Sequence, residues 1–132
     1  MTIEGIPGIY VHDTHCTPYA TAIAQGIKPI ETRTRDVLGR FVGEKVLIIR
    51  TRNSHPADVV GQAVIASKRF YSAAELDAMR DQTLIPPGSK YDCQGRGKWG
   101  YTMTDQILYS KPIPLSAFSI VSKTRSYAIL TV

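Results

Sequence analysis

Two runs of β-branched and aliphatic residues limit the fold of this chain more than any other feature. Residues 45–51 read Lys-Val-Leu-Ile-Ile-Arg-Thr, an apolar run flanked by charge that is typical of a strand. Residues 59–66 form a second apolar run, in which Gly61 indicates a bulge or a close approach of two backbones. Loop-forming residues at 53–58 separate the runs. We therefore expect two buried strands joined by a loop.

Shorter patterns predict the remaining elements. Strand-like segments occupy 9–11, 30–34, 99–103, 107–115 and 126–132. Residues 19–25 predict a helix with Thr17 as cap, Pro18 at its first position and Gly26 as its stop. Ser72 to Glu75 reads as a capping box that opens another helix through about Arg80. Short strands with two or three short helices predict one α+β domain over residues 1–132, a small mixed and mostly antiparallel β-barrel.

Composition excludes several classes of protein. Hydrophobic residues make up 43% and charged residues 20%, which is typical of a folded domain. No apolar run approaches the roughly 20 residues that cross a bilayer, so we expect no membrane partner. Residues 1–7 lack the pattern of a secretion signal, and we expect a cytoplasmic location. Cys16 and Cys93 form no Cys-x-x-Cys pair, so we predict free thiols, no metal site and no cofactor.

Positive charge is concentrated in two segments of a chain whose net charge is +5. The first holds six cations against Asp36 and Glu44: Arg33, Arg35, Arg40, Lys45, Arg50 and Arg52. Alternate residues of a strand share one face, so the pairs at 33/35 and 50/52 predict a basic stripe. The second holds Lys90, Arg96 and Lys98 with Asp92. Both favour a polyanionic partner such as RNA.

The segment that follows the first helix carries the chemistry. It reads Gly26-Ile27-Lys28-Pro29-Ile30-Glu31-Thr32-Arg33, the pattern Gly-x-Lys-x-x-Glu-x-Arg. On a strand, Glu31 and Arg33 share one face, and Lys28 lies just before them. Lysine and arginine can hold a phosphate, and a carboxylate can accept hydrogen bonds from a base amino group. The alternative is an exposed ion pair at a strand end, which contributes little stability.

This pattern after a short helix resembles the signature of ASCH domains, a branch of the PUA-like superfamily. Pro18-Tyr19-Ala20 is similar to the turn that often opens the family's helix. Gly43 to Ile48 is similar to the family's second strand, and Tyr127 to Leu130 to its closing strand. The resemblance spans most of the chain, but its specific part is the eight-residue motif. It implies a PUA-like β-barrel with a cleft beside the motif, suited to RNA or nucleotides.

The resemblance leaves more than one activity open. Some small bacterial members remove the acetyl group of acetylcytidine, others have been assigned as ribonucleases, and many are thought to bind RNA only. The amidohydrolases use a lysine at the position matching Lys28 and a threonine nucleophile where this chain has Glu31. Here Glu31 would instead activate water as a general base, with Lys28 as acid or oxyanion partner. These two residues are therefore the catalytic candidates of the hydrolase alternative.

A glycine-rich segment, residues 85–100, supplies the remaining candidates. Long irregular loops inside compact domains are often functional. We expect Tyr91 to form a pocket wall, Arg96 and Lys98 to contact phosphate, and Trp99 to fill the core. The predicted ligand-binding set is Lys28, Glu31, Arg33, Arg35, Tyr91, Arg96 and Lys98, for RNA, a nucleotide or a modified nucleoside. A non-enzymatic factor that binds another protein through the basic face is the third alternative, and the sequence does not indicate an oligomeric state.

Overall fold

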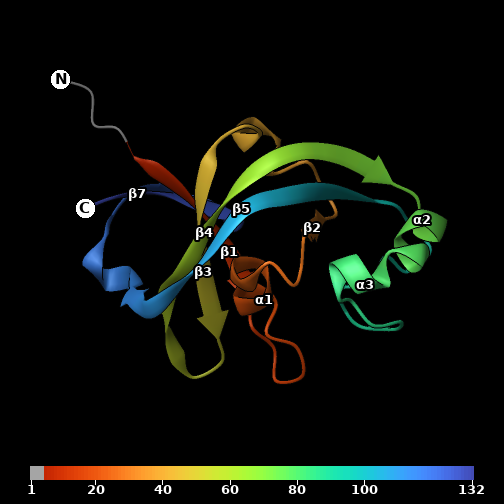
Figure 1. Ribbon diagram of the computed structural model, residues 1–132, viewed down its shortest axis with the longest axis horizontal. Helices are drawn as coiled ribbons and strands as arrows, with labels where there is room; N and C mark the ends of the chain where they lie inside the picture. Colours follow the sequence, from red (N-terminus) through yellow and green to blue (C-terminus); the bar gives the residue numbers. More distant parts are fainter. Residues whose placement is uncertain (1–4) are drawn as a thin grey trace.

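A seven-stranded mixed sheet forms the frame of the molecule, with α1 (Tyr19–Gln25) against one face and two short helices at one end (Figure 1). The structure, a computed structural model, describes residues 5–132. Residues 1–4, which begin the segment that we expect to carry no secretion signal, lie outside the described residues. The strands are β1 (Ile6–His12), β2 (Ile30–Arg33), β3 (Lys45–Arg52), β4 (His55–Tyr71), β5 (Lys98–Pro114), β6 (Ser119–Lys123) and β7 (Tyr127–Thr131). The other helices are α2 (Ala73–Ala78), α3 (Arg80–Thr83) and two single 3₁₀ turns, η1 (Gly39–Phe41) and η2 (Leu115–Ala117).

The sheet is open. Its strand order is β2-β5-β4-β3-β1-β7-β6. β1 and β3 are parallel and the other neighbouring pairs are antiparallel, so the predicted mixed, mostly antiparallel α+β fold is confirmed. The predicted closure into a β-barrel is wrong, because β2 and β6 end the sheet of residues 5–132 and do not pair. A closed barrel needs a hydrogen-bonded ladder between its end strands.

The apolar run of β3 is buried on both faces of the sheet. Val46 and Ile48 belong to the hydrophobic cluster beneath α1, whereas Leu47 and Ile49 belong to a second cluster on the opposite face. A strand covered on both faces loses the alternation of polar and apolar residues. This burial explains why the run is continuous in the sequence, and it places β3 at the centre of the fold.

Helix α1 is held from outside its own sequence. The predicted cap at Thr17 is wrong: the helix begins at Tyr19, and its N-cap residue Pro18 offers no side-chain bond. Asp13, just after β1, instead accepts hydrogen bonds from the backbone N–H of Ala20 at 2.7 Å and from Thr21 Oγ1 at 2.9 Å. At the other end, Gly26 has the left-handed φ of 82° that ends the helix, as predicted. The chain then turns directly into the Lys28 segment.

The predicted capping box is confirmed. Ser72 accepts a hydrogen bond from the backbone N–H of Glu75, and the Glu75 carboxylate accepts one from the Ser72 backbone. The helix ends earlier than predicted, because Met79 leaves helical geometry and α3 begins at Arg80.

Strands β4 and β5 are longer than predicted, with 17 residues each. The segments 99–103 and 107–115 belong to one strand, and β4 already begins at His55, inside the predicted loop. Repeated register shifts between β4 and β5 let the pair bend while it continues through polar residues. β6, fully exposed at the edge, has no counterpart among the predicted strands.

Trp99 is half-buried at the margin of the main core and does not fill it as predicted. Tyr101, with no exposed surface, fills the core instead.

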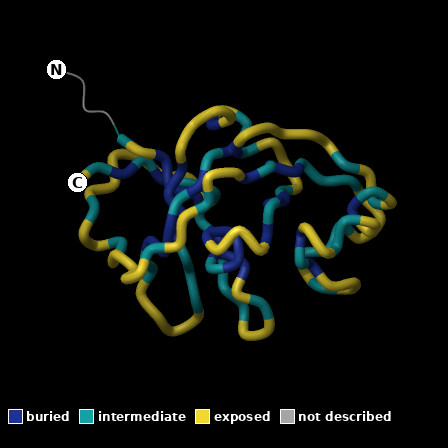
Figure 2. The backbone as a smooth tube through the Cα atoms, viewed as in Figure 1, coloured by how far each residue is buried: buried dark blue, intermediate teal, exposed yellow. Residues whose placement is uncertain are grey.

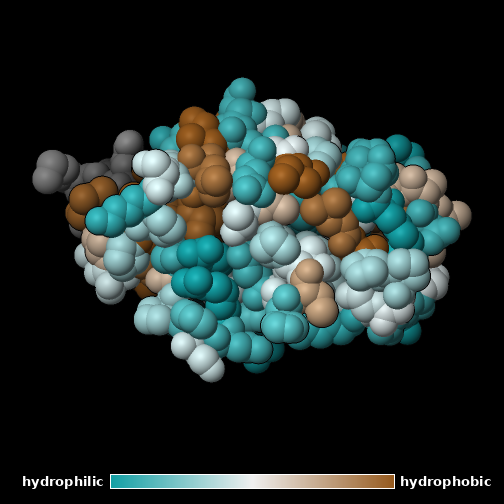
Figure 3. Space-filling view, turned by 60° about the horizontal axis from the view of Figure 1, so that its bottom comes forward, coloured by the Kyte–Doolittle hydropathy of each residue, from teal (hydrophilic) through white to brown (hydrophobic). Residues whose placement is uncertain are grey.

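Apolar side chains also reach the surface in patches between hydrophilic ones (Figure 3). The exposed ones include Ile27, Phe70, Ile107, Leu108 and Val121. Among residues 5–132, no helix combines the length and the apolar character that a membrane span requires.

Gly61 has the close backbone approach that the sequence predicts. A Cβ at this position would lie 2.1 Å from the carbonyl oxygen of Ile107 and 2.7 Å from Ala24 Cβ. We expect Gly61→Ala to lower the free energy of unfolding by about 1–3 kcal/mol, because strand β5 and helix α1 would both have to move away from the new Cβ on β4. Urea unfolding measures the change. Ser67→Ala, an exposed position of the same strand, is the control, and a Gly61→Ala protein as stable as this control would contradict the prediction.

Candidate functional site

A pocket of about 350 Å³ lies between β1 and the free edge of β2. Strand β1 contributes the segment from Tyr10 to His12, β2 contributes Glu31 to Arg33, and helix α1 contributes Tyr19. The segment after α3, residues 84–97, is called the roof segment below. It contributes Ile85 and Tyr91 to the pocket wall, and Lys98 at the start of β5 lies next to it. The volume is within the usual range of small-ligand sites.

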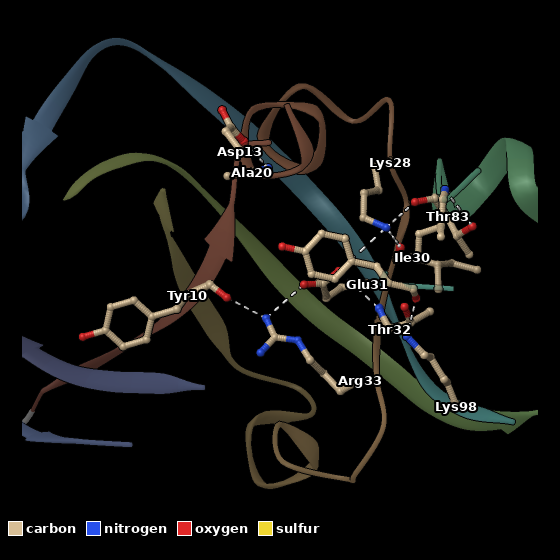
Figure 4. Close-up of polar contacts among 12 residues, drawn as sticks. Tyr10, Asp13, Ala20, Lys28, Ile30, Glu31, Thr32, Arg33, Thr83 and Lys98 are labelled. Carbon is tan, nitrogen blue, oxygen red and sulfur yellow. Dashed lines mark hydrogen bonds and ion pairs between the residues drawn. The ribbon is translucent and has the colours of Figure 1, made fainter. Parts of the chain in front are cut away.

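Lys28 lies on the inner side of this pocket and is almost completely buried, with 1% of its surface exposed. Its Nζ donates hydrogen bonds to the carbonyl of Ile30 at 2.8 Å and to the carbonyl of Thr83 (Figure 4). It also lies 3.7 Å from Oε1 of Glu31. Burial lowers the pKa of Lys28, and the Glu31 charge only partly offsets this effect. The ammonium group therefore ties the turn after α1 to the end of α3.

Glu31 and Arg33 form the next part of the wall. Glu31 Oε2 accepts a hydrogen bond from Arg33 Nη2 at 2.9 Å, and Oε1 accepts one from the backbone N–H of Thr32 at 3.2 Å. The same Arg33 Nη2 donates to the carbonyl oxygen of Tyr10 at 2.7 Å, which links β2 to β1 (Figure 4). Burial raises the pKa of Glu31, but the charges of Arg33 and Lys28 outweigh burial and hold that pKa below its ordinary value. The carboxylate is ionised at neutral pH.

The roof segment is held by its backbone. Asp92 accepts hydrogen bonds from the backbone N–H groups of Gly88 at 3.0 Å and Cys93 at 2.9 Å. These two bonds, helped by Arg80, lower the pKa of Asp92 to about 2. Arg80 also donates to the carbonyl of Ile85 at 2.9 Å. The segment is therefore fixed as a compact loop above the pocket.

Tyr91 projects from this loop into the pocket wall. Its ring meets Tyr19 edge to face, with ring centroids 5.7 Å apart. Lys98 Nζ donates a hydrogen bond to the backbone carbonyl of Tyr91, and burial lowers the pKa of Lys98. The pocket therefore has an aromatic side next to a cationic one.

Positive charge dominates the pocket. Four cationic residues and one carboxylate contribute to its wall, a net charge of +3 with His12 neutral; they are Lys28, Arg33, Lys98, Arg125 and Glu31. His12 Nδ1 lies 2.9 Å from Thr51 Oγ1 at the β1 side of the pocket. An anionic ligand group would be attracted to this wall.

Solved structures of ASCH proteins from Zymomonas mobilis share this architecture. A serine-to-alanine variant superposes with a TM-score of 0.69 over 98% of this chain and 92% of that chain, at 17% sequence identity. The chain has an ASCH-like fold. Another ASCH structure from that organism superposes with a TM-score of 0.65, at 19% identity, over 83% of this chain and 74% of that one. No family model and no curated protein matches the sequence.

Five residues of the predicted set line one pocket of the ASCH-like fold: Lys28, Glu31, Arg33, Tyr91 and Lys98. Arg35 and Arg96, the other two members of the predicted set, are exposed and do not contribute to the pocket wall. Arg35 follows the end of β2, and Arg96 precedes β5 on the outer part of the roof segment. The eight-residue motif and the roof segment therefore meet at the pocket, whereas Arg35 and Arg96 lie outside it.

The predicted basic stripe is interrupted by ion pairs. Arg50 binds Asp58 through two hydrogen bonds of 2.8 and 2.6 Å, and Arg52 lies 3.4 Å from the same carboxylate. Arg50 and Asp58 are partners in the β3–β4 register, which explains why the acid neutralises these cations. Positive charge remains concentrated at the pocket.

Sequence reasoning missed Tyr10, Tyr19 and Arg125 as pocket residues. Tyr19 carries a signal only as an apolar helix position, and Arg125 lies in a turn before β7 with no distinctive pattern. Cys16 and Cys93 are free, and residues 5–132 contain no group of three or more potential His, Cys, Asp or Glu metal ligands.

The contacts of Lys28 generate a stability prediction. Lys28→Met would leave the buried carbonyls of Ile30 and Thr83 without their donor, and Glu31 would lose one of its two cations. We expect the free energy of unfolding to fall by about 3–5 kcal/mol, measured by urea unfolding. Lys111→Met, at an exposed position of β5, should stay within about 0.5 kcal/mol of the unmodified protein. Equal stability of the two variants would contradict a structural role for the ammonium group.

The lowered pKa of Glu31 generates a pH prediction. Because this carboxyl binds its proton more weakly in the folded state, its stabilisation is present above its ordinary pKa of 4.5 and is lost as the pH falls through the lower folded value. Unfolding free energies measured between pH 7 and pH 3 should therefore fall more steeply for the unmodified protein than for Glu31→Gln. Parallel curves would show that the folded state does not depress this pKa.

Proposed function

We propose that the pocket binds one nucleotide unit, supplied by RNA, a free nucleotide or a modified nucleoside. The observation that carries the proposal is the convergence of an ionised carboxylate, four cationic residues and tyrosine side chains in one pocket of about 350 Å³. Pockets of this volume, in which polar groups converge beside aromatic side chains, are typical of small-ligand sites. The ASCH-like fold is compatible with this ligand class.

Glu31 suits the recognition of a base. An ionised carboxylate offers about four lone-pair sites and donates nothing. Thr32 N–H and Arg33 already use two of them, and Lys28 lies near a third. The remaining capacity favours a ligand donor such as the exocyclic amino group of a base.

The cations suit a phosphate. Arg33 Nη2 already donates to Glu31 and Tyr10, so Arg33 offers a phosphate its Nη1 and Nε donors singly. Lys98 and Arg125 add positive charge on the same wall. Tyr91 and Tyr19 provide ring surface beside them for contact with a base. Affinity would come from the cations, and discrimination from the carboxylate.

Binding agrees better with these groups than hydrolysis does. A general base works best with a pKa near the operating pH, whereas the pKa of Glu31 lies below its ordinary value. The Lys28 ammonium already faces three protein oxygens, so it has no free proton directed at a ligand. The hydrolase alternative makes a distinct prediction, namely acetate release from acetylcytidine above the level of a Lys28→Ala control.

Calorimetric titration with the four ribonucleoside 5′-monophosphates tests the proposal. We expect saturable binding of at least one of them, weakened about tenfold by Lys98→Ala and by Glu31→Gln, because each substitution removes a charged partner. Lys123→Ala, at an exposed position of β6, should leave binding within twofold.

Two results would overturn the proposal: no binding at millimolar concentrations, or pocket variants that bind like the Lys123→Ala control. A protein-interaction factor would give the first of these. If phosphate contacts drive the binding, the affinity must also fall as salt rises.

A further inference from the structure

A second aromatic surface lies outside the pocket. Phe70 on β4 and Trp99 on β5 are direct cross-strand partners, and their rings meet edge to face with centroids 5.6 Å apart. Lys68 Nζ lies 5.3 Å from the Trp99 ring centroid. These three residues are called the platform below. Phe70 keeps 51% of its surface exposed, although it is one of only three phenylalanines in the chain.

The platform lies on an uncovered stretch of sheet. Residues 66–70 of β4 are all exposed, along the outer rim of the molecule (Figure 2). The Phe70 ring meets Gly97, where a Cβ would come within 2.5 Å of the phenyl carbons. An exposed phenylalanine next to a half-buried tryptophan, with a cation beside them, matches the composition of a base-stacking surface.

The segments that contact the platform carry further cations. Arg96 immediately precedes the glycine that packs against Phe70, and Arg35 immediately precedes Asp36, whose carboxylate binds Lys68. Exposed Arg35 and Arg96 are therefore chain neighbours of residues that contact the platform, while Asp36 pairs with Lys68 and Glu75 with Arg69. These two arginines are the predicted site residues that the pocket does not use. The positive charge of these two arginines favours a polyanionic partner.

The platform is continuous with the pocket. Arg33 lines the pocket and is the cross-strand partner of Trp99 in the β2–β5 register. Because β2 is the end strand of the sheet, nothing in the ladder covers its outer edge. A chain of nucleotides leaving the pocket at Arg33 can therefore reach Trp99 on β5 within one strand spacing, about 5 Å, and Phe70 on β4 within two.

We propose that the natural ligand is single-stranded RNA, with one nucleotide in the pocket and a neighbouring base stacked on the platform. This inference rests on the proposed function, since it assumes that the pocket holds a nucleotide. It goes further by excluding a free nucleotide or nucleoside as the complete ligand. Single-stranded RNA is the form whose bases are free to stack on aromatic side chains.

The test uses a fluorescein-labelled RNA octamer of mixed sequence, with cytidine 5′-monophosphate as an unlabelled competitor. We expect Phe70→Ser to weaken octamer binding about tenfold, as loss of one stacked base should, and to leave competition by the monophosphate within twofold. Val121→Ser, an equally exposed apolar position on β6, is the matched control and should change neither. Arg96→Ala should weaken the octamer and reduce its salt dependence.

Trp99 gives a second readout that does not depend on a substitution. It is the single tryptophan of the chain, so fluorescence excited selectively from tryptophan comes from this platform residue. The unlabelled octamer should quench this fluorescence, and the monophosphate and an RNA duplex of the same sequence should not. Equal quenching by octamer and duplex would overturn the inference, since a duplex has no free base to stack.

The two proposals fail differently. If Lys98→Ala and Glu31→Gln weaken both ligands while Phe70→Ser weakens neither, the pocket proposal stands and the platform is overturned. If no pocket variant changes the affinity for either ligand, the proposed function itself is wrong.

Discussion

The buried cluster of Lys28, Glu31 and Arg33 determines how the sheet and the helices meet. Charges removed from water require partners, and here one carboxylate lies between two cations, while backbone carbonyls accept further hydrogen bonds from those cations. Those carbonyls belong to Ile30, Thr83 and Tyr10, which lie on β2, α3 and β1. The cluster thus joins three segments that share no backbone ladder with one another.

This arrangement gives the pocket two parts with different physical properties. The floor consists of buried ions whose hydrogen-bond partners are already present, so a ligand meets groups that need little rearrangement. The roof segment contains few buried residues and is held mainly by Asp92, Arg80 and backbone bonds. The preorganised floor favours selectivity for a ligand donor, and the roof supplies the aromatic contact area.

The sequence predicts the floor well because its information is local. Spacing alone places Glu31 and Arg33 on one face, and Gly26 fixes the turn that leads to Lys28. The open sheet and the length of β4 and β5 were not predictable, since bulges and end-strand pairing depend on contacts between distant residues. For the same reason the sequence misplaced Arg50 as a free cation: only the hairpin register brings Asp58 against it. Tyr10 and Arg125 reach the pocket through topology, without a local signal.

The way the roof segment holds Tyr91 has a consequence for divergence among related chains. Lys98 binds the carbonyl of residue 91, and Asp92 binds neighbouring amides, so the path of the loop does not require a particular side chain at position 91. Exchange of that single side chain would alter the shape of the wall while the loop keeps its course. Such a site can acquire a new preference by one codon change, whereas the ionic floor would need several coordinated replacements.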